Sequence, residues 1–286
     1  MPGGLYWLAS YPKSGNTWFR SFLHNLVTEA EVPADINTLA TDAIASSRGW
    51  MDEVLGFDSA DLSAEEMDRL RPDIYAWTAR ETEAPGYHKV HDAWRVLPDG
   101  RALLDAQATR GAVYLLRNPL DVAVSLANHN AIDIDTAITE MNDSAHALAR
   151  NRRGLPGQVR QIMGSWSDHV TSWADAPDLD CHLLRYEDMQ EDPQRVFTAA
   201  ARFLGLPDAP DRIARAIRFS RFDTLARQEA EQGFRERPAK VRRFFREGRS
   251  GGWRRHLTPD QVDRIVTAHA ATMRRFGYLD ESAGPV

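Results

Sequence analysis

A lysine inside a short polar loop, close to the start of the chain, is the first group suited to chemistry. The loop Tyr11-Pro-Lys-Ser-Gly-Asn-Thr-Trp18 follows the apolar run 5–9, and the apolar residues after it recur at helical spacing up to Leu26. This order predicts a strand, a tight loop and a helix. Backbone N–H groups and the positive end of the helix dipole converge in such a loop, so residues 14–17 and Lys13 are expected to bind a phosphate-like anion.

The position of this lysine distinguishes the loop from those that hydrolyse nucleoside triphosphates. Their spacing, G-x-x-x-x-G-K-[ST], places a lysine directly after the second glycine. Laid on this chain, the second glycine is Gly15 and the lysine position holds Asn16, followed by Thr17. Lys13 stands three residues before that position and would approach the transferred group from another side.

An arginine and a serine eight residues apart form a second expected anion site. Arg117 ends an apolar run that starts at Ala112 and reads as a buried parallel strand, and Ser125 lies about two turns into the following predicted helix. Ligands of open α/β sheets bind at the carboxyl ends of the strands, and a planar guanidinium suits phosphate. The alternative is that Arg117 only pairs with Asp121.

A histidine near a lysine is the candidate general base. Residues two apart in a strand share one face, so Lys89 and His91 are expected to point to the same side, and His88 away from it. Histidine is the usual base for removing a proton near neutral pH. The chain has nine histidines, so the alternative for His91 taken alone is a surface or core histidine.

These motifs resemble those of the cytosolic sulfotransferases, which use 3′-phosphoadenosine 5′-phosphosulfate (PAPS) and release 3′-phosphoadenosine 5′-phosphate (PAP). The octapeptide 11–18 is similar to their 5′-phosphosulfate loop, and Arg117 with Ser125 is similar to the pair that grips the 3′-phosphate. The segment 89–91 matches their Lys-x-His. The resemblance implies a PAPS-dependent sulfotransferase.

The resemblance also implies roles for the catalytic residues. His91 would take the proton of an acceptor hydroxyl or amine, with Lys89 beside it, and the acceptor would attack sulfur in line. Lys13 would stabilise the departing PAP, with help from Ser125. No metal ion is expected, because the sequence shows no paired-carboxylate cluster of the Walker B type.

The same resemblance assigns the nucleotide pocket and the loop that closes it. Trp18 and Tyr186 are similar to residues near the adenine, and 219–222 is a weaker match; for Trp18 a core position is the alternative. The segment 245–253 resembles the closing loop, but Glu247 stands where a lysine is usual, so its side chain is expected to point outward. The expected cofactor-binding residues are Lys13, Ser14, Gly15, Asn16, Thr17, Trp18, Arg117, Ser125, Tyr186, Ser220, Phe222, Phe245, Arg246, Glu247 and Gly248.

Strand and helix patterns alternate along the chain, which predicts an α/β, three-layer P-loop-like fold with a central, mainly parallel sheet flanked by helices. Strands are expected at 5–9, 86–91, 112–117 and 181–185, and helices at 16–26, 120–129, 164–174, 193–204, 211–217 and 258–276. A short helix at 103–107, a polar helical stretch at 131–160, and loops and short helices at 29–73 are also expected. Trp166 and Trp173, seven residues apart, are expected in the core.

The chain is expected to form a single sulfotransferase domain over residues 1–286. Acceptor-site insertions are expected around 29–85 and 130–160, and a basic cofactor-closing loop at 234–257. The identity of the acceptor is open among small aromatic, steroid, glycopeptide and other natural-product hydroxyls. Two other functions also stay open, namely a P-loop nucleotide kinase and a catalytically silent nucleotide-binding protein of the same fold.

Charge is spread unevenly along the sequence. The chain carries 35 Lys and Arg against 41 Asp and Glu, a net charge of −6, which excludes a globally basic nucleic-acid binder. Residues 235–255 hold nine bases and two acids, and residues 29–73 hold twelve acids and three bases. An anionic nucleotide explains the basic segment, against a solvated face or a nucleic-acid patch. The acidic segment favours a cationic or neutral acceptor unless it is only a solvated face.

Composition also sets expectations for partners and location. The sequence has no run of 18 apolar residues, so no membrane span is expected. A single cysteine, Cys181, forms no internal disulfide, and a cytoplasmic location is expected. The expected partner is a small-molecule hydroxyl acceptor, not a nucleic acid. A homodimer is compatible with the family resemblance.

Overall fold

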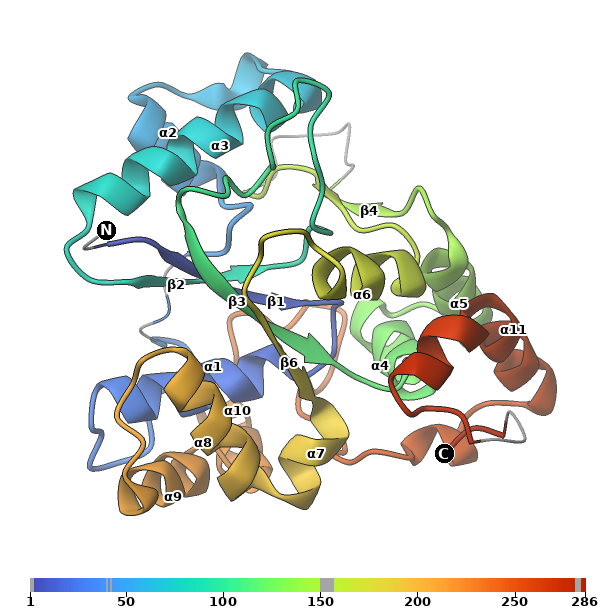
Figure 1. The fold of residues 1–286 in the computed structure, drawn as a ribbon. Helices are drawn as coiled ribbons and strands as arrows, with labels where there is room; N and C mark the ends of the chain where they lie inside the picture. The colour runs from blue at the N-terminus through green and yellow to red at the C-terminus, as the bar shows by residue number, and fades with distance from the viewer. Residues whose placement is uncertain (1–2, 40, 42, 150–156, 281–283) are drawn as a thin grey trace. The chain divides into compact units, whose positions relative to one another are not determined.

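The computed structural model describes residues 3–39, 41, 43–149, 157–280 and 284–286 (Figure 1). The chain folds as two compact units, and each is built from three separate segments. Unit 1 comprises Met1–Tyr11, Thr41–Tyr114 and Ser144–Leu183, and unit 2 comprises Pro12–Ala40, Leu115–Asp143 and Leu184–Val286. The single domain expected over 1–286 stays a prediction.

Unit 1 contains most of the main sheet, whose strand order is β2-β1-β3-β6. The strands are β1 (Leu5–Ser10), β2 (Gly86–Val90), β3 (Thr109–Leu116) and β6 (Cys181–Arg185). β1 and β2 are parallel, with Leu5 opposite Gly86 and Ala9 opposite Val90, and the four arrows run in the same general direction in Figure 1. The four predicted strands are confirmed; β6 has the predicted bounds, and the ends of the other three differ by at most three residues.

The helices of unit 1 are better formed than the sequence pattern predicts. They are α2 (Arg48–Leu55), the short η1 (Ser59–Asp61), α3 (Ala64–Glu81) and α6 (Trp166–Ala174). α3 has 18 residues, so the expectation of only loops and short helices up to residue 73 is wrong. A capping box between Ser63 and Glu66 starts this helix, and buried Met67 and Ile74 lie along it. The buried Trp166 and Trp173 confirm the predicted core position.

The helices predicted for two other stretches, 103–107 and 131–160, are not formed as expected. Residues 103–107 form turns, because the Asp105 carboxylate accepts the N–H groups of Gln107 and Ala108, both at 2.8 Å. The stretch 131–160 is helical only in α5 (Ile134–Asn142), which belongs to unit 2. It continues in unit 1 as β4 (Ala147–Leu148), paired antiparallel with β5 (Gln161–Ile162). The expected end near 152–154 lies outside the described residues.

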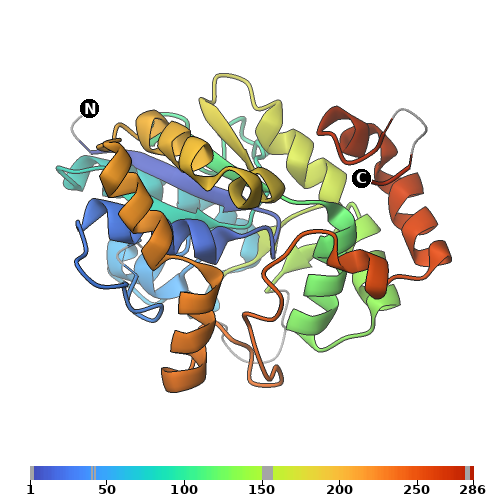
Figure 2. The ribbon, with the colours of Figure 1, turned by 90° about the horizontal axis from the view of Figure 1, so that it is seen from below.

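Unit 2 is mainly helical. Its helices are α1 (Asn16–Val27), α4 (Pro119–Asn130), α5, α7 (Tyr186–Glu191), α8 (Pro193–Phe203), α9 (Pro210–Phe219), α10 (Phe222–Gln232), η2 (Gly252–Arg255) and α11 (Pro259–Arg275). α9 packs against α1 and α8, while α5 packs against α4 and α11. Apart from η2, the segment between α10 and α11 runs as a loop, as predicted; it is drawn in orange in Figure 2. α7 and α10 were not predicted from the sequence.

Among the described residues, no helix combines the length and the apolar character that a membrane crossing requires.

Candidate active site

The polar loop that opens unit 2 has the backbone shape of an anion site. Lys13 and Gly15 have positive φ angles of 73° and 100°, and α1 begins at the next residue, Asn16. A Cβ at position 15 would lie 2.7 Å from the ring of Tyr186, so this position requires glycine. Left-handed residues at a helix N-terminus shape concavities that bind anions. The predicted loop is therefore formed by the chain as expected.

Arg117 lies beside this loop, at the end of β3. Its Nη1 donates to the carbonyl of Lys13 at 3.0 Å and its Nη2 to the carbonyl of Arg249 at 3.1 Å. The guanidinium carbon lies 4.2 Å from the centre of the Tyr186 ring. Two carbonyls and a ring hold this charge in place without neutralising it, so the site retains positive charge for an anion.

Asp121 does not neutralise Arg117. Its carboxylate accepts the backbone N–H groups of Gly251 at 2.7 Å and Trp253 at 2.9 Å, and no ion pair joins it to Arg117 within the described ranges. The alternative in which Arg117 only pairs with Asp121 is therefore wrong. Asp121 instead ties the predicted closing loop to α4, one helical turn before the partly exposed Ser125.

The side chain of Lys13 has two neighbours that the sequence analysis missed. Its Nζ lies 3.7 Å from the centre of the Phe244 ring and 3.3 Å from Nδ1 of His129. His129 follows Ser125 by four residues on α4, a spacing that places two side chains on one helix face and was available from the sequence. Phe244 is fixed by its N–H, which donates to the buried carboxylate of Glu229 at 2.7 Å.

Trp18 and Tyr186, the predicted adenine neighbours, contact each other. Their ring centres lie 5.7 Å apart at 76°, and Trp18 also meets Phe197 at 5.6 Å. Trp18 is only half-buried, and its Nε1 is a buried donor without a hydrogen-bond partner within the described residues. The structure thus brings the two residues together, while their contact with adenine stays a prediction.

The weaker sequence match at 219–222 behaves differently at its two ends. The Ser220 hydroxyl is buried and donates to the carbonyl of Ala216 at 2.9 Å, so it caps α9. Phe222 lies directly against Gly248, where φ is 60° and a Cβ would be 2.1 Å from the Phe222 ring. Phe222 thus supports the closing loop, and Phe245 packs against Phe222 at 6.2 Å.

Glu247 of the closing loop is paired with basic residues near it in the sequence. Its carboxylate bonds Arg255 at 2.7 Å and His256 at 3.2 Å and lies 3.5 Å from Arg246. Partial burial alone would raise the pKa of Glu247, but the hydrogen bond to His256 and the nearby arginines bring this pKa below its usual value. The negative charge is thus compensated locally, which explains how an acid fits into a basic segment.

The candidate base, His91, belongs to unit 1. Its Nδ1 lies 2.8 Å from the carbonyl oxygen of Ser10, which can only accept, so the proton resides on Nδ1 and the lone pair on Nε2. β2 ends at Val90, so strand alternation covers the half-buried Lys89 but not His91. His88 is buried and stacks on Trp50, with ring centres 4.5 Å apart.

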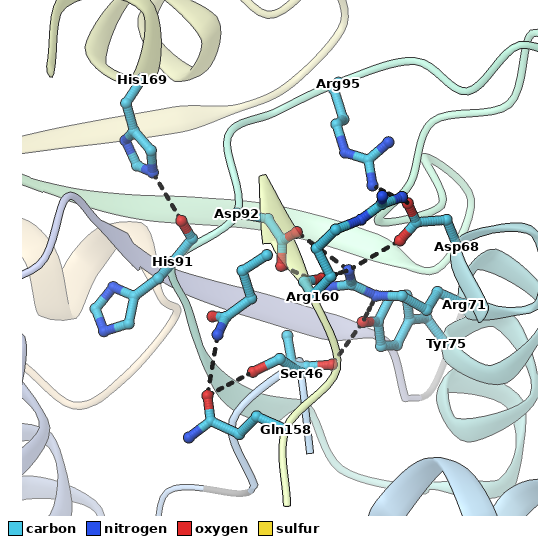
Figure 3. A network of polar contacts seen from close by, with 12 residues as sticks. Ser46, Asp68, Arg71, Tyr75, His91, Asp92, Arg95, Gln158, Arg160 and His169 are labelled. Atoms are coloured by element: carbon cyan, nitrogen blue, oxygen red, sulfur yellow. Dashed lines mark hydrogen bonds and ion pairs between the residues drawn. The ribbon is translucent and has the colours of Figure 1, made fainter. Parts of the chain in front are cut away.

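A second layer of buried side chains fixes the backbone of His91 (Figure 3). Nε2 of His169 donates to the His91 carbonyl at 3.1 Å, and the Tyr114 hydroxyl donates to Nδ1 of His169 at 2.8 Å. Burial lowers the pKa of His169 to about 4, so this imidazole is neutral near pH 7. These bonds hold the candidate base from behind.

Asp92, the residue after His91, forms a buried ion pair with Arg71 (Figure 3). Nη1 and Nη2 of Arg71 donate to the two Asp92 oxygens at 3.1 and 2.6 Å, and both side chains are fully buried. Arg71 also donates from Nε to the Tyr75 hydroxyl at 2.9 Å. Burial alone would lower the pKa of Arg71, but Asp92 and Tyr75 raise this pKa above its ordinary value. The Arg71 guanidinium is therefore charged.

The residues of unit 2 fit a polyanionic nucleotide. Ser14 Oγ, Trp18 Nε1 and Arg117 Nε are buried donors without partners in the part of the chain that the structure describes. Buried polar groups in proteins almost always have partners, so these three donors suit a ligand with many oxygens. Among the same residues, no group of three or more His, Cys, Asp or Glu side chains is placed to hold a metal ion.

Comparisons with known proteins show which family the chain resembles. Residues 5–277 match the family model described as the sulfotransferase domain. The chain is 25% identical over 272 residues to human sulfotransferase 2B1, covering 93% of this chain and 65% of the relative, slightly less than two thirds. It is 22% identical over 274 residues to flavonol 3-sulfotransferase of Flaveria bidentis, covering 90% and 78%.

Solved structures agree on the fold. Mouse sulfotransferase SULT7A1 complexed with PAP has a TM-score of 0.60 and 18% identity, covering 95% of this chain and 85% of that one. Retinol dehydratase in complex with androsterone and inactive cofactor PAP has a TM-score of 0.59 and 18% identity, covering 94% and 80%. The predicted fold class and the resemblance to sulfotransferases are confirmed, and the enzyme class is confirmed at the level of the family.

Proposed function

Because the chain belongs to the sulfotransferase family, we propose that it transfers a sulfuryl group from PAPS to a hydroxyl or amine of a small-molecule acceptor. The observation that carries the proposal is the hydrogen bond from Arg117 to the carbonyl of Lys13. It joins two anion-binding motifs that lie 104 residues apart in the sequence. A donor with phosphates at both its 5′ and 3′ ends engages both motifs at once.

In this proposal unit 2 binds the nucleotide. The backbone of residues 14–17 and Lys13 hold the 5′ end, and Arg117 and Ser125 hold the 3′-phosphate. Trp18 and Tyr186 offer aromatic surface for the base. PAPS, when bound, supplies an electrophilic sulfur and a phosphate leaving group. The named side chains orient it and, because they are partly buried, interact with its charges more strongly than they would in water.

Unit 1 supplies the base. The Ser10 carbonyl fixes the tautomer of His91, so Nε2 accepts the acceptor's proton and the imidazolium that forms stays bonded through Nδ1. Lys13 places a positive charge where negative charge develops on the departing group. Lys89 is half-buried and precedes His91 by two residues, so it adds a positive charge on the same segment as the base. No step in this account requires a metal ion.

The proposal also covers the setting of the reaction. Relatives of the chain include cytosolic sulfotransferases of Arabidopsis thaliana, and a cytoplasmic location is proposed for this chain as well. The acceptor is proposed to be a small molecule, because proteins of similar fold have been solved in complex with androsterone and with retinol. A homodimer also belongs to the proposal.

Calorimetry with PAP tests the nucleotide assignment. Arg117→Ala should weaken PAP binding about 10- to 100-fold, as expected for the loss of one charge-assisted contact. Arg110→Ala is the matched control, because Arg110 lies at the other end of β3 and is exposed. Binding of ATP with Mg²⁺ in preference to PAP would support a nucleotide kinase instead. PAP binding without transfer of labelled sulfate to any member of a broad acceptor panel would support a silent nucleotide-binding protein.

A further inference from the structure

A cavity of about 640 Å³ in unit 2 combines an apolar wall with a cluster of positive charges. Its size lies within the range of small-molecule sites. The apolar wall comes from α4 and the residues after it, namely Val124, Ala127, Ile132 and Ile134. The opposite wall comes from the basic segment between α10 and α11, namely Lys240, Arg242, Arg243 and Arg246, with His256 from the end of η2.

Lys240, Arg242 and Arg243 differ from the other basic residues of the cavity, because Arg246 and His256 both contact the Glu247 carboxylate. Arg246 donates from Nε and Nη1 to the Asn128 amide oxygen, at 3.0 and 2.9 Å, in the amide orientation that pairs donors with acceptors. Lys240, Arg242 and Arg243 form no ion pair with a carboxylate of the described chain, and no carboxylate lines the cavity. Like charges that gather without counter-charges raise the local positive potential, which attracts an anion.

The cavity is distinct from the predicted 3′-phosphate site. Successive residues of a helix are turned by about 100°, so Val124, Ala127 and Asn128 share one face of α4 while Ser125 and His129 lie on another. The apolar wall would also add nothing to the binding of a phosphate group alone. Arg246, predicted to hold the 3′-phosphate, lines this cavity, and its part in cofactor binding stays a prediction.

Two residues of the cavity lining are sequence neighbours of the residues that contact Lys13. Asn128 and Arg243 directly precede His129 and Phe244, the two neighbours of the Lys13 ammonium. On α4 and on the basic segment, a residue that lines the cavity is thus followed directly by a residue that contacts Lys13. This is a suitable place for the body of a molecule whose hydroxyl is sulfated.

We propose that this cavity binds the acceptor, and that the acceptor is an amphipathic anion with an apolar body and an acidic group. The inference rests on the proposed function and specifies its substrate class. Lys240, Arg242 and Arg243 would hold the carboxylate, sulfate or phosphate of the acceptor, and the α4 wall would cover its apolar part. It replaces the expectation, drawn from residues 29–73, that a cationic or neutral acceptor is favoured.

Matched pairs of acid and ester test the inference. The probes are 4-(4-hydroxyphenyl)butanoate and its methyl ester, titrated into the protein saturated with PAP. The acid should bind at least about tenfold more tightly than the ester at low salt, and this advantage should shrink as salt screens the charges. Arg242→Gln/Arg243→Gln should reduce the advantage to below about threefold and leave ester binding unchanged. Arg235→Gln, in the same basic segment but outside the cavity, is the control.

Each remaining outcome is informative. Equal binding of acid and ester, or no binding of either at millimolar concentration, would overturn the inference while leaving PAP binding intact. Competition between the acid and PAP would assign the cavity to the cofactor and overturn it as well. With labelled PAPS, transfer to the acid should exceed transfer to the ester by at least about tenfold in kcat/KM. Tight binding of the acid without transfer would refute its role as acceptor, and failure of PAP itself to bind would refute the proposed function.

Discussion

Replacing Asp92 by asparagine tests whether the buried ion pair behind His91 stabilises the fold. The substitution removes a carboxylate that accepts two hydrogen bonds from Arg71, and neither side chain is exposed to water. Removing one member of a buried pair costs about 3–5 kcal/mol, because the other charge stays buried without compensation. Here Asp68 lies 3.6 Å from Arg71 and compensates in part. We therefore expect the lower end of that range, a loss of about 3 kcal/mol.

Thermal unfolding followed by calorimetry measures this loss. For a chain of this size, about 3 kcal/mol corresponds to a decrease in Tm of about 6–12 °C. Asp99→Asn is the matched control, because Asp99 pairs with Arg101 at 2.9 Å but both side chains are 41% exposed. Exposed pairs contribute about 0–1 kcal/mol, so the control should keep its Tm within about 4 °C.

A double variant separates the charge effect from packing. Arg71→Met/Asp92→Leu removes both charges and fills the space with apolar atoms, so it should be more stable than Asp92→Asn alone. PAP affinity, which unit 2 carries in the proposed function, should stay within about twofold in all these variants. A Tm for Asp92→Asn equal to that of the control would show that the buried pair contributes no more than a surface pair, and would refute the reasoning.

Three further predictions concern the candidate site. His91→Ala should lower kcat by about 10²–10⁴-fold in a PAPS assay while PAP still binds, and unchanged turnover would exclude it as the base. Between pH 7 and pH 5 the free energy of unfolding should fall by about 2 kcal/mol because of His169, whose pKa is about 4 when folded and ordinary when unfolded, so that the unfolded chain binds the proton first. In urea titrations His169→Gln should lack this component, and an equal loss in the variant would contradict the assignment. Gly15→Ala should strain the loop by about 1–3 kcal/mol, since φ is 100° and the new Cβ meets Tyr186. It should therefore weaken PAP binding in calorimetry, and an unchanged PAP affinity would contradict the requirement for glycine at this position.

The elements with strong local signals were predictable from the sequence. β3 is a continuous buried apolar run, and α11 begins with the Thr258 cap and Pro259, both confirmed. The anion loop was predictable because its chemistry is local: the turn at Lys13 and Gly15 and the helix start at Asn16 are adjacent in the chain. Local patterns of this kind depend on few neighbours, so one sequence suffices to recognise them.

The failures occurred where tertiary contacts decide. α3 contains Pro72 and many charged residues, so its helical period is weak, yet a buried face that includes Arg71 and Tyr75 stabilises it. The Asp105 side chain bonds two backbone N–H groups and converts an apolar-looking helix into turns. Phe244 lies on Lys13, although more than 200 residues separate them in the sequence. Such contacts leave no periodic signal.

The partners of the arginines distinguish structural from functional charges in this chain. Arg71 is fully buried and is neutralised by Asp92, so its charge stabilises the fold and is closed to other ligands. Arg117 is held by two carbonyls and an aromatic ring, and Arg242 and Arg243 have no carboxylate partner in the described residues. Arg117, which is partly buried and held by neutral groups, has already incurred part of its desolvation and therefore gains most from binding an anion, whereas Arg242 and Arg243 are exposed and attract an anion through their field. The net charge of −6 conceals this difference, and the distribution of ion pairs reveals it.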